Sequence, residues 1–178
     1  MKETITFSQR PDLEINNEIL EICFIELDKQ QFNYEINIIV GVVYRPPNTD
    51  VTQFNEQLSL ILNKLKNLNV KHYLVGDYNI NLLNYENHIP TSEFVDLMYS
   101  YTLFPLIRKP TRIQSNSATL IDNIFSNISL DGLYFNGILV TDVSDHYPVF
   151  HIDIGHEFKK EEPYMLKRDI CARNKDRF

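Results

Sequence analysis

The sequence predicts one layered domain of the α/β or α+β class, and three observations support this prediction. The chain has 178 residues, enough for a single domain with a real core. Its composition, 43% hydrophobic and 23% charged, is ordinary for a globular protein. Strand-like apolar runs and amphipathic segments follow one another in the order strand, strand, helix, strand, helix, strand, strand, strand.

The first two strands are predicted at residues 19–27 and 35–44, which are rich in Ile, Val and Phe. A short polar segment joins them and has the length of a hairpin loop. The second run is almost continuously apolar, which predicts a strand covered on both faces. It ends in YRPPN (44–48), where two prolines remove backbone donors and fix φ.

Apolar residues recur every three or four positions from Val51 to Leu65, as in an amphipathic helix. Asp50 with Gln53 resembles a capping box at its start. A second helix is predicted over residues 92–101, with Thr91 or Ser92 as its cap. The apolar run at 72–76 lies between the two helices and predicts a strand that ends in GDYN.

The last three strands are predicted at residues 119–126, 137–142 and 148–154. They follow a loop that contains KPTR (109–112). Residues 155–178 are polar, basic and aperiodic, which is typical of a linker or tail.

The charge is unevenly distributed. Residues 1–158 carry 10 Lys and Arg against 20 Asp and Glu, whereas residues 159–178 carry 7 against 4. An acidic body disfavours a protein that coats nucleic acid through bulk charge, because phosphate contacts need Lys and Arg. A metal-dependent enzyme acting on phosphodiesters remains compatible, since the cation supplies positive charge where it is needed.

The two cysteines, Cys23 and Cys171, lie far apart and in no metal-binding spacing, so we expect reduced thiols. The N-terminus lacks the apolar region of a signal peptide, and no apolar stretch approaches the ~20 residues needed to span a bilayer. We therefore expect an intracellular protein, nuclear or cytoplasmic, that is neither secreted nor associated with a membrane.

Polar groups suited to a reaction centre lie at predicted strand ends and, in the case of Asp122, in the middle of the strand predicted at 119–126. These residues are Tyr44, Asp77, Asn79, Asp122, Asp145 and His146. Taken singly, each has a structural explanation as a turn residue, an exposed strand residue, a strand-end aromatic or a surface imidazole. Taken together they favour one site, because turns do not require an acid, an amide, a phenol and an imidazole at successive strand ends.

The motifs YRPPN, GDYN, SATLIDNIFSN and SDHYPVF, in this order and at these separations, resemble the endonuclease domain of non-LTR (LINE-type) retrotransposons. That domain belongs to the exonuclease–endonuclease–phosphatase superfamily. The resemblance covers about residues 19–154, and the tail YMLKRDICARNKDRF (164–178) is similar to the linker that leads into the reverse transcriptase, which is absent here. It implies a four-layer α/β sandwich, two packed sheets flanked by helices, with the site at one edge of the sheets.

The resemblance also implies a site that nicks DNA with Mg²⁺ or Mn²⁺. Asp77 would orient or deprotonate the attacking water, and Asn79 and Tyr44 would hydrogen-bond the phosphate. His146 would contact the scissile phosphate while Asp122 orients its imidazole.

The implied metal ligands are Asp77, Asn79 and Asp145, whose oxygen atoms suit hard cations. DNA is the implied partner.

The family pattern normally begins upstream with one strand that carries an Asn and another that ends in a metal-binding Glu. Residues 1–18 show no counterpart, since Glu14 and Glu18 stand in polar surroundings. We therefore expect residues 1–18 to lie outside the family pattern and residues 19–154 to be its C-terminal two-thirds, incomplete at the N-terminus. Such a domain would expose an apolar sheet face and be weakly active or inactive.

Two alternatives stay open at this point. The chain could be a non-catalytic remnant that acts as a binding module. It could also be another phosphoesterase of the same superfamily, such as a phosphoinositide or nucleotide phosphatase.

Overall fold

The computed structural model describes residues 5–31, 34–68, 70–128 and 134–154. Its strands and helices, in chain order, are β1 (Phe7–Gln9), β2 (Ile15–Asn16), β3 (Glu21–Leu27), β4 (Ile38–Tyr44), α1 (Val51–Leu68), β5 (Lys71–Asp77), α2 (Ile89–Ser100), β6 (Phe104–Pro105), β7 (Arg112–Gln114), β8 (Ser117–Thr119), β9 (Asp122–Ser126), β10 (Tyr134–Ile138) and β11 (Val149–Asp153). Single 3₁₀ turns lie at Pro11–Leu13, Lys29–Gln31 and Leu82–Asn84.

The main sheet is mixed and runs in the order β1-β3-β4-β5-β9-β6, with β2 also paired to β3. The β3–β4 and β5–β9 pairs are antiparallel, whereas β4 and β5 are parallel and joined through α1. A parallel pair needs such a crossover because its second strand starts at the opposite edge. Two hairpins, β7–β8 and β10–β11, stand apart from this sheet.

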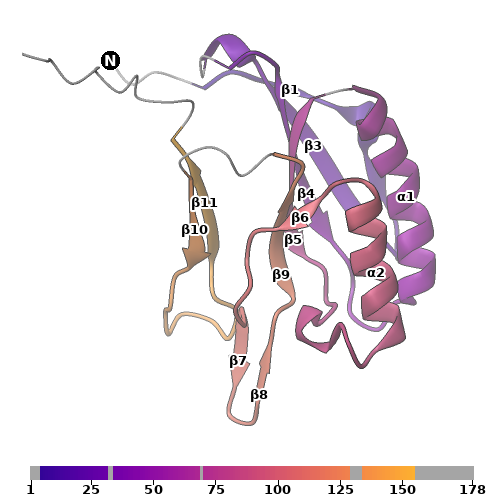
Figure 1. The fold of residues 1–178 in the computed structure, drawn as a ribbon, viewed down its shortest axis with the longest axis vertical. Coiled ribbons are helices and arrows are strands. Elements are labelled where there is room, and N and C mark those ends of the chain that lie inside the picture. Colours follow the sequence, from indigo (N-terminus) through magenta and orange to yellow (C-terminus); the bar gives the residue numbers. More distant parts are fainter. Residues whose placement is uncertain (1–4, 32–33, 69, 129–133, 155–178) are drawn as a thin grey trace, which may run out of the picture.

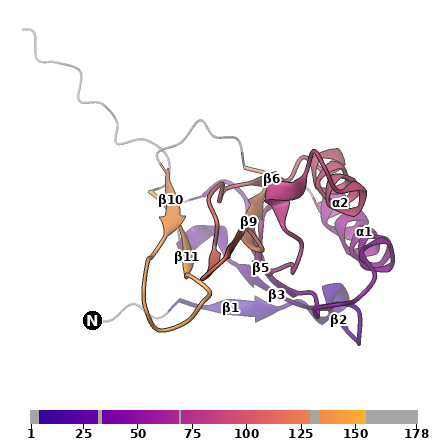
Figure 2. The ribbon, with the colours of Figure 1, turned by 90° about the horizontal axis from the view of Figure 1, so that it is seen from below.

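The two faces of the main sheet are covered differently, as Figures 1 and 2 show. Helices α1 and α2 pack on one face, which we call the helix face. The β10–β11 hairpin stands over part of the other face, which we call the hairpin face. The fold is thus an α/β sandwich, and the described residues supply the helical layer, the main sheet and a two-stranded facing sheet.

The helix face holds the larger core. Helix α1 begins where Asp50 Oδ1 accepts a hydrogen bond from Gln53 N at 2.9 Å, which caps its first turn. The rings of Phe54, Tyr78, Phe94 and Phe125 meet between the helices and the sheet, with centroids 5.2–6.0 Å apart. All four residues are almost fully buried. On the hairpin face a smaller cluster joins Ile38, Tyr73, Leu106 and Ile124, with Val149 of β11 packed against it.

Several predicted boundaries were wrong. Helix α2 begins at Ile89, because Pro90 suits the first helical turn, and the expected caps Thr91 and Ser92 lie inside the helix. The strand expected at 137–142 is β10, which ends at Ile138 and leaves Leu139 and Val140 exposed.

The run predicted as one strand at 119–126 is divided into β8 and β9. Between them the backbone of Leu120 and Ile121 bonds elsewhere: Leu120 N donates to Asn81 Oδ1 and Ile121 O accepts from Tyr78 N. Asp122 is therefore the first residue of β9 and not a mid-strand residue.

Strand β4 was expected to be covered on both faces, but Val42 is 54% exposed on the hairpin face. An apolar run can form a strand without a layer to cover both sides of it. Residues 7–16 extend the main sheet, because β1 and β2 pair with β3 and Leu13 is buried. The domain boundaries themselves stay a prediction, and the tail at 155–178 lies outside the described residues.

Neither of the two described α-helices has the length and apolar character that crossing a bilayer requires.

Candidate functional site

Strand register brings three of the predicted site residues into one row. Tyr44 pairs with Asp77 across β4 and β5, and Asp77 pairs with Asp122 across β5 and β9. Side chains alternate between the faces of a strand, and the neighbours Val43 and Asn123 are buried on the helix side. The row therefore lies on the hairpin face, at the edge of the main sheet where β5 ends and β9 begins.

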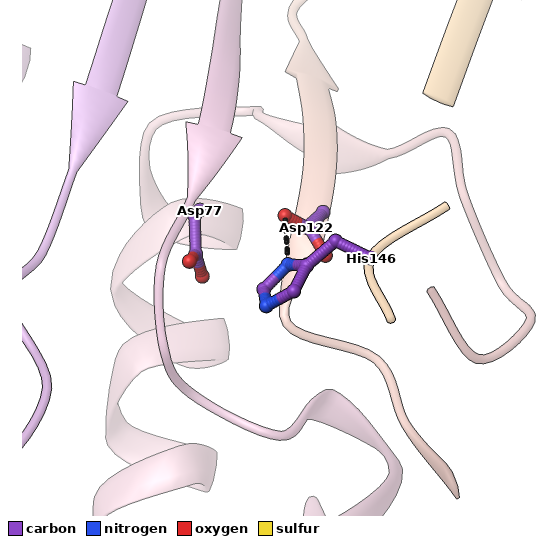
Figure 3. Close-up of side chains that lie close together, drawn as sticks. All are labelled: Asp77, Asp122 and His146. Carbon is purple, nitrogen blue, oxygen red and sulfur yellow. Dashed lines mark hydrogen bonds and ion pairs between the residues drawn. The ribbon is translucent and has the colours of Figure 1, made fainter. Parts of the chain in front are cut away.

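His146 approaches this row from the loop that precedes β11. Its Nδ1 lies 3.2 Å from both carboxylate oxygens of Asp122. Three ligand atoms, one from each of Asp77, Asp122 and His146, lie within 4.8 Å of one another. Figure 3 shows the three side chains reaching into the same space from β5, β9 and the loop. The Asp122 side chain is 17% exposed and that of His146 31%, so the pair is shielded but reachable from solvent.

The environment of Asp77 makes its carboxylate more basic than usual. Burial raises the pKa of Asp77, and the nearby charge of Asp122 raises it further. The backbone N–H of Asn79 donates to Asp77 Oδ1 at 2.9 Å and opposes this shift. A carboxylate with a raised pKa is a better proton acceptor at neutral pH.

The GDYN corner depends on close backbone contacts. A Cβ on Gly76 would lie 1.7 Å from the carbonyl oxygen of Val43, so only glycine lets β4 and β5 come this close. Asn79 adopts a left-handed conformation with φ of 48°, which Asn tolerates better than most residues. Its Nδ2 donates to the carbonyl of Arg45 at 2.8 Å and lies 3.3 Å from Asp77 Oδ2. Asn79 therefore ties the ends of β4 and β5 together.

Two predicted site residues stand apart from the Asp77, Asp122 and His146 group. Asp145 is exposed, and its Oδ2 accepts from Arg112 Nε at 2.8 Å and from Gln114 Nε2 at 3.1 Å. The hydrogen bond from Arg112 keeps the pKa of Asp145 below its usual value. Tyr44 is 38% exposed, and its phenol has no hydrogen bond to a described residue. It lines a hollow of about 240 Å³ beside β2 and β3.

Sequence reasoning missed the residue that holds both halves of the Asp122–His146 pair in place. Thr111 is fully buried, and its Oγ1 accepts from the backbone N–H of Asp122 at 3.0 Å. Its carbonyl accepts from Tyr147 N at 2.7 Å, next to His146. The KPTR motif that contains Thr111 was visible in the sequence, but nothing local showed that its hydroxyl would be buried against β9.

The three clustered side chains fit a divalent cation. Two carboxylates and an imidazole are common ligands of Mn²⁺ and Zn²⁺, and the carboxylates also suit Mg²⁺. The arrangement thus combines a candidate cation site, a basic carboxylate and a carboxylate-oriented histidine.

Comparison with known protein families decides the origin of this arrangement. A family described as endonuclease-reverse transcriptase matches residues 38–150. The chain belongs to the endonuclease-reverse transcriptase family. The resemblance to retrotransposon endonucleases is therefore confirmed. A comparison with curated proteins found no match for this family member.

Solved structures support the fold of this endonuclease-reverse transcriptase family member. The endonuclease domain of TRAS1, a telomere-specific non-LTR retrotransposon, is similar with a TM-score of 0.64 and 20% identity over 84% of this chain and 67% of that domain. The Xenopus laevis APE2 catalytic domain is similar with a TM-score of 0.52 and 18% identity over 75% of this chain and 54% of that domain. A protein of the endonuclease/exonuclease/phosphatase family from Leptotrichia buccalis C-1013-b has a TM-score of 0.51 and 18% identity, over 72% of this chain and 52% of that one.

These likenesses show the exonuclease–endonuclease–phosphatase fold. The chain spans about two thirds of the TRAS1 domain and about half of the other two structures.

Proposed function

We propose that the chain is a divalent-metal-dependent phosphodiesterase that nicks DNA inside the cell. One observation carries the proposal: Asp122 contacts His146 Nδ1 at 3.2 Å, and Asp77 belongs to the same 4.8 Å group. In a member of the endonuclease-reverse transcriptase family, this group suits the attack of water on a phosphodiester better than a structural role.

Asp77 is the proposed base. It takes a proton from the attacking water as the new phosphorus–oxygen bond forms. The bond between phosphorus and the leaving sugar oxygen breaks, and that oxygen takes up a proton from solvent.

His146 is the proposed phosphate contact. Because Nδ1 is bonded to Asp122, the Nε2 atom is directed away from that bond and is left to contact a phosphate oxygen. Asn79 and Tyr44 stand on the neighbouring strand ends and are proposed as further donors to the phosphate. For Asn79 this requires its amide to leave Arg45 O when substrate binds.

We propose that Asp77 and Asp122 hold Mg²⁺ or Mn²⁺, with Asn79 as a further oxygen ligand beside Asp77. The cation would supply positive charge that polarises the phosphoryl group. Asp145 would join this set only if its bonds to Arg112 and Gln114 broke. The ligand set is small, so this chain should bind the cation weakly and nick slowly.

A plasmid-nicking assay tests the proposal. The purified chain is incubated with supercoiled plasmid and Mg²⁺ or Mn²⁺, and the open-circular product is followed over time. We expect slow nicking that EDTA stops and that Asp77→Ala or His146→Ala lowers by at least about 100-fold.

A matched control is Asp142→Asn, which removes an exposed carboxylate from the loop that carries His146. It should nick as the wild type does. Metal-dependent nicking that survives His146→Ala would show that another group, or a contaminant, cleaves the DNA. No nicking at any metal concentration would leave the chain as a non-catalytic remnant.

A further inference from the structure

A groove of about 610 Å³ lies beside the edge strand of the main sheet, between two segments that are distant in sequence. Residues 104–109 form one wall, and β10 forms the other at positions 134 and 136–138. The walls are tied together where Asn136 Nδ2 donates to the carbonyl of Leu106. Figure 1 labels β6 and β10, the strands that contribute to the two walls.

The groove carries free positive charge on an acidic protein. Arg108 and Lys109 are adjacent and exposed, and neither has an ionic or hydrogen-bonding partner among the described residues. Every other described Lys or Arg contacts a carboxylate, a carbonyl or an aromatic ring; these residues are Arg10, Lys29, Arg45, Lys64, Lys66, Lys71 and Arg112. Arg108 and Lys109 are therefore the described cations best able to meet an external anion.

The groove also carries aromatic rings held in place by other rings. Phe104 is 48% exposed, and its ring lies 5.5 Å from that of Tyr99. Tyr134 packs on His151 with centroids 5.8 Å apart. Aromatic faces beside Lys and Arg are the elements that bind unpaired nucleic-acid strands, because bases stack on the rings while phosphates meet the cations.

The segment that forms one wall of the groove continues to the candidate site. Residues 106–111 run along β9 toward Asp122: Leu106 N donates to Ile124 O at 2.8 Å, and Thr111 Oγ1 accepts from Asp122 N at 3.0 Å. Lys109 is two residues from Thr111, which is at most about 7 Å of chain. A strand lying in the groove would therefore have its phosphates close to the Asp122–His146 pair.

We propose that this groove binds an unpaired stretch of nucleic-acid strand next to the phosphate to be cleaved. Phosphates lie against Arg108 and Lys109, and a base stacks on Phe104. The proposal rests on the proposed nuclease function for its biological sense, but its binding step needs neither the metal nor catalysis.

Fluorescence anisotropy with a labelled single-stranded DNA of mixed sequence tests the groove, in EDTA so that nothing is cleaved. For the double variant Arg108→Gln/Lys109→Gln we expect affinity to fall at least about tenfold at low salt. The negative slope of log binding constant against log salt concentration should become shallower by about 1.4, because two phosphate contacts are lost. Phe104→Leu should weaken binding about tenfold without changing the slope.

The matched control is Lys64→Gln/Lys66→Gln on α1, which makes the same charge change on the helix face. It should bind as the wild type does. If the two double variants lost affinity equally, the loss would come from the net charge of the protein, and the proposed groove would be wrong. If Phe104→Leu bound as the wild type does, or if these variants lost affinity for blunt duplex DNA by the same factor, the groove would not be specific for an unpaired strand.

The two proposals fail separately. Wild-type binding by the Arg108/Lys109 variant, in a chain that nicks through Asp77 and His146, would remove the groove and keep the nuclease. If the chain never nicks but its binding depends on Arg108 and Lys109, the groove stands and the nuclease function is wrong.

Discussion

The two faces of the main sheet show how differently one sheet can be used. On the helix face, α1 and α2 seal a core in which Phe54, Phe94 and Phe125 are almost fully buried. On the hairpin face the apolar cluster is small, Val42 is half exposed, and the acidic residues of the candidate site stand in a row. The helix face therefore supplies the stability that lets the hairpin face keep charged, partly buried groups.

The largest expected effect is the loss of an aromatic ring from the helix face. Phe94→Ala removes a ring in contact with Phe54, Tyr78 and Phe125, and should lower the free energy of unfolding by about 3–5 kcal/mol. Urea denaturation followed by circular dichroism measures this. Phe135→Ala, a 57% exposed ring on β10, is the matched control and should change it by less than about 0.5 kcal/mol. Similar losses at both positions would mean that the hairpin is as well packed as the helix face.

Adjacent valines on β4 compare the faces directly. Val43 is 1% exposed on the helix face and Val42 is 54% exposed on the hairpin face. Val43→Ala should cost about 2 kcal/mol of unfolding free energy, since two buried methyl groups and their contacts are lost. Val42→Ala should cost less than about 0.5 kcal/mol in the same titration. If Val42→Ala proved as costly, another layer would have to cover β4 in solution.

These two valines also show the limit of sequence analysis. The run from Ile38 to Val43 predicted a strand correctly, because Ile and Val favour strands and prolines end it. The same run could not show which face lacks a covering layer, since this depends on elements elsewhere in the chain. Strands as short as β6 and β7 escaped prediction because two or three residues carry no periodicity.

The candidate site divides in the same way. The motifs predicted that Asp77 and His146 stand next to strand ends, whereas Asp122 was expected inside a strand and is the first residue of β9. The register of β5 and β9 then sets Asp77 and Asp122 side by side. The partner of Asp145 could not be predicted, because Arg112 comes from a hairpin 33 residues away in sequence. Thr111 could not be predicted as a site residue, because only the structure shows that its hydroxyl is buried and accepts a hydrogen bond from Asp122 N.

A smaller effect is expected where the hairpin is attached to the main sheet. The hydroxyl of Tyr73 lies 3.3 Å from His151 Nε2 and 3.3 Å from Asp153 Oδ2, both on β11. Tyr73→Phe removes these contacts and should cost about 0.5–1.5 kcal/mol of unfolding free energy. Hydrogen exchange should show faster opening of β10 and β11 than of β3 and β4. Tyr99→Phe removes a hydroxyl that makes no hydrogen bond to a described residue, keeps the ring contact with Phe104, and should leave both readouts unchanged.

The smallest expected effect is a pH dependence that belongs to the hairpin face. Burial raises the pKa of Asp77 in the folded chain above its unfolded value, so the folded state releases this proton later than the unfolded state. Asp77 therefore lowers stability as pH rises through about 4 and beyond, and it costs nothing below that range.

Asp77→Asn keeps the acceptor for Asn79 N–H but cannot ionise, so in EDTA it should melt above the wild type at pH 7 and near it at pH 3. Added Mn²⁺ should raise the melting temperature of the wild type more than that of the variant, because the variant lacks one of the two carboxylates proposed to hold the cation. Thermal melts of Asp142→Asn, which changes an exposed carboxylate, should follow the wild type under all these conditions. A difference in melting temperature between Asp77→Asn and the wild type that stayed constant with pH would show that the substitution acts through packing. The buried charge of Asp77 would then not distinguish the hairpin face from the helix face.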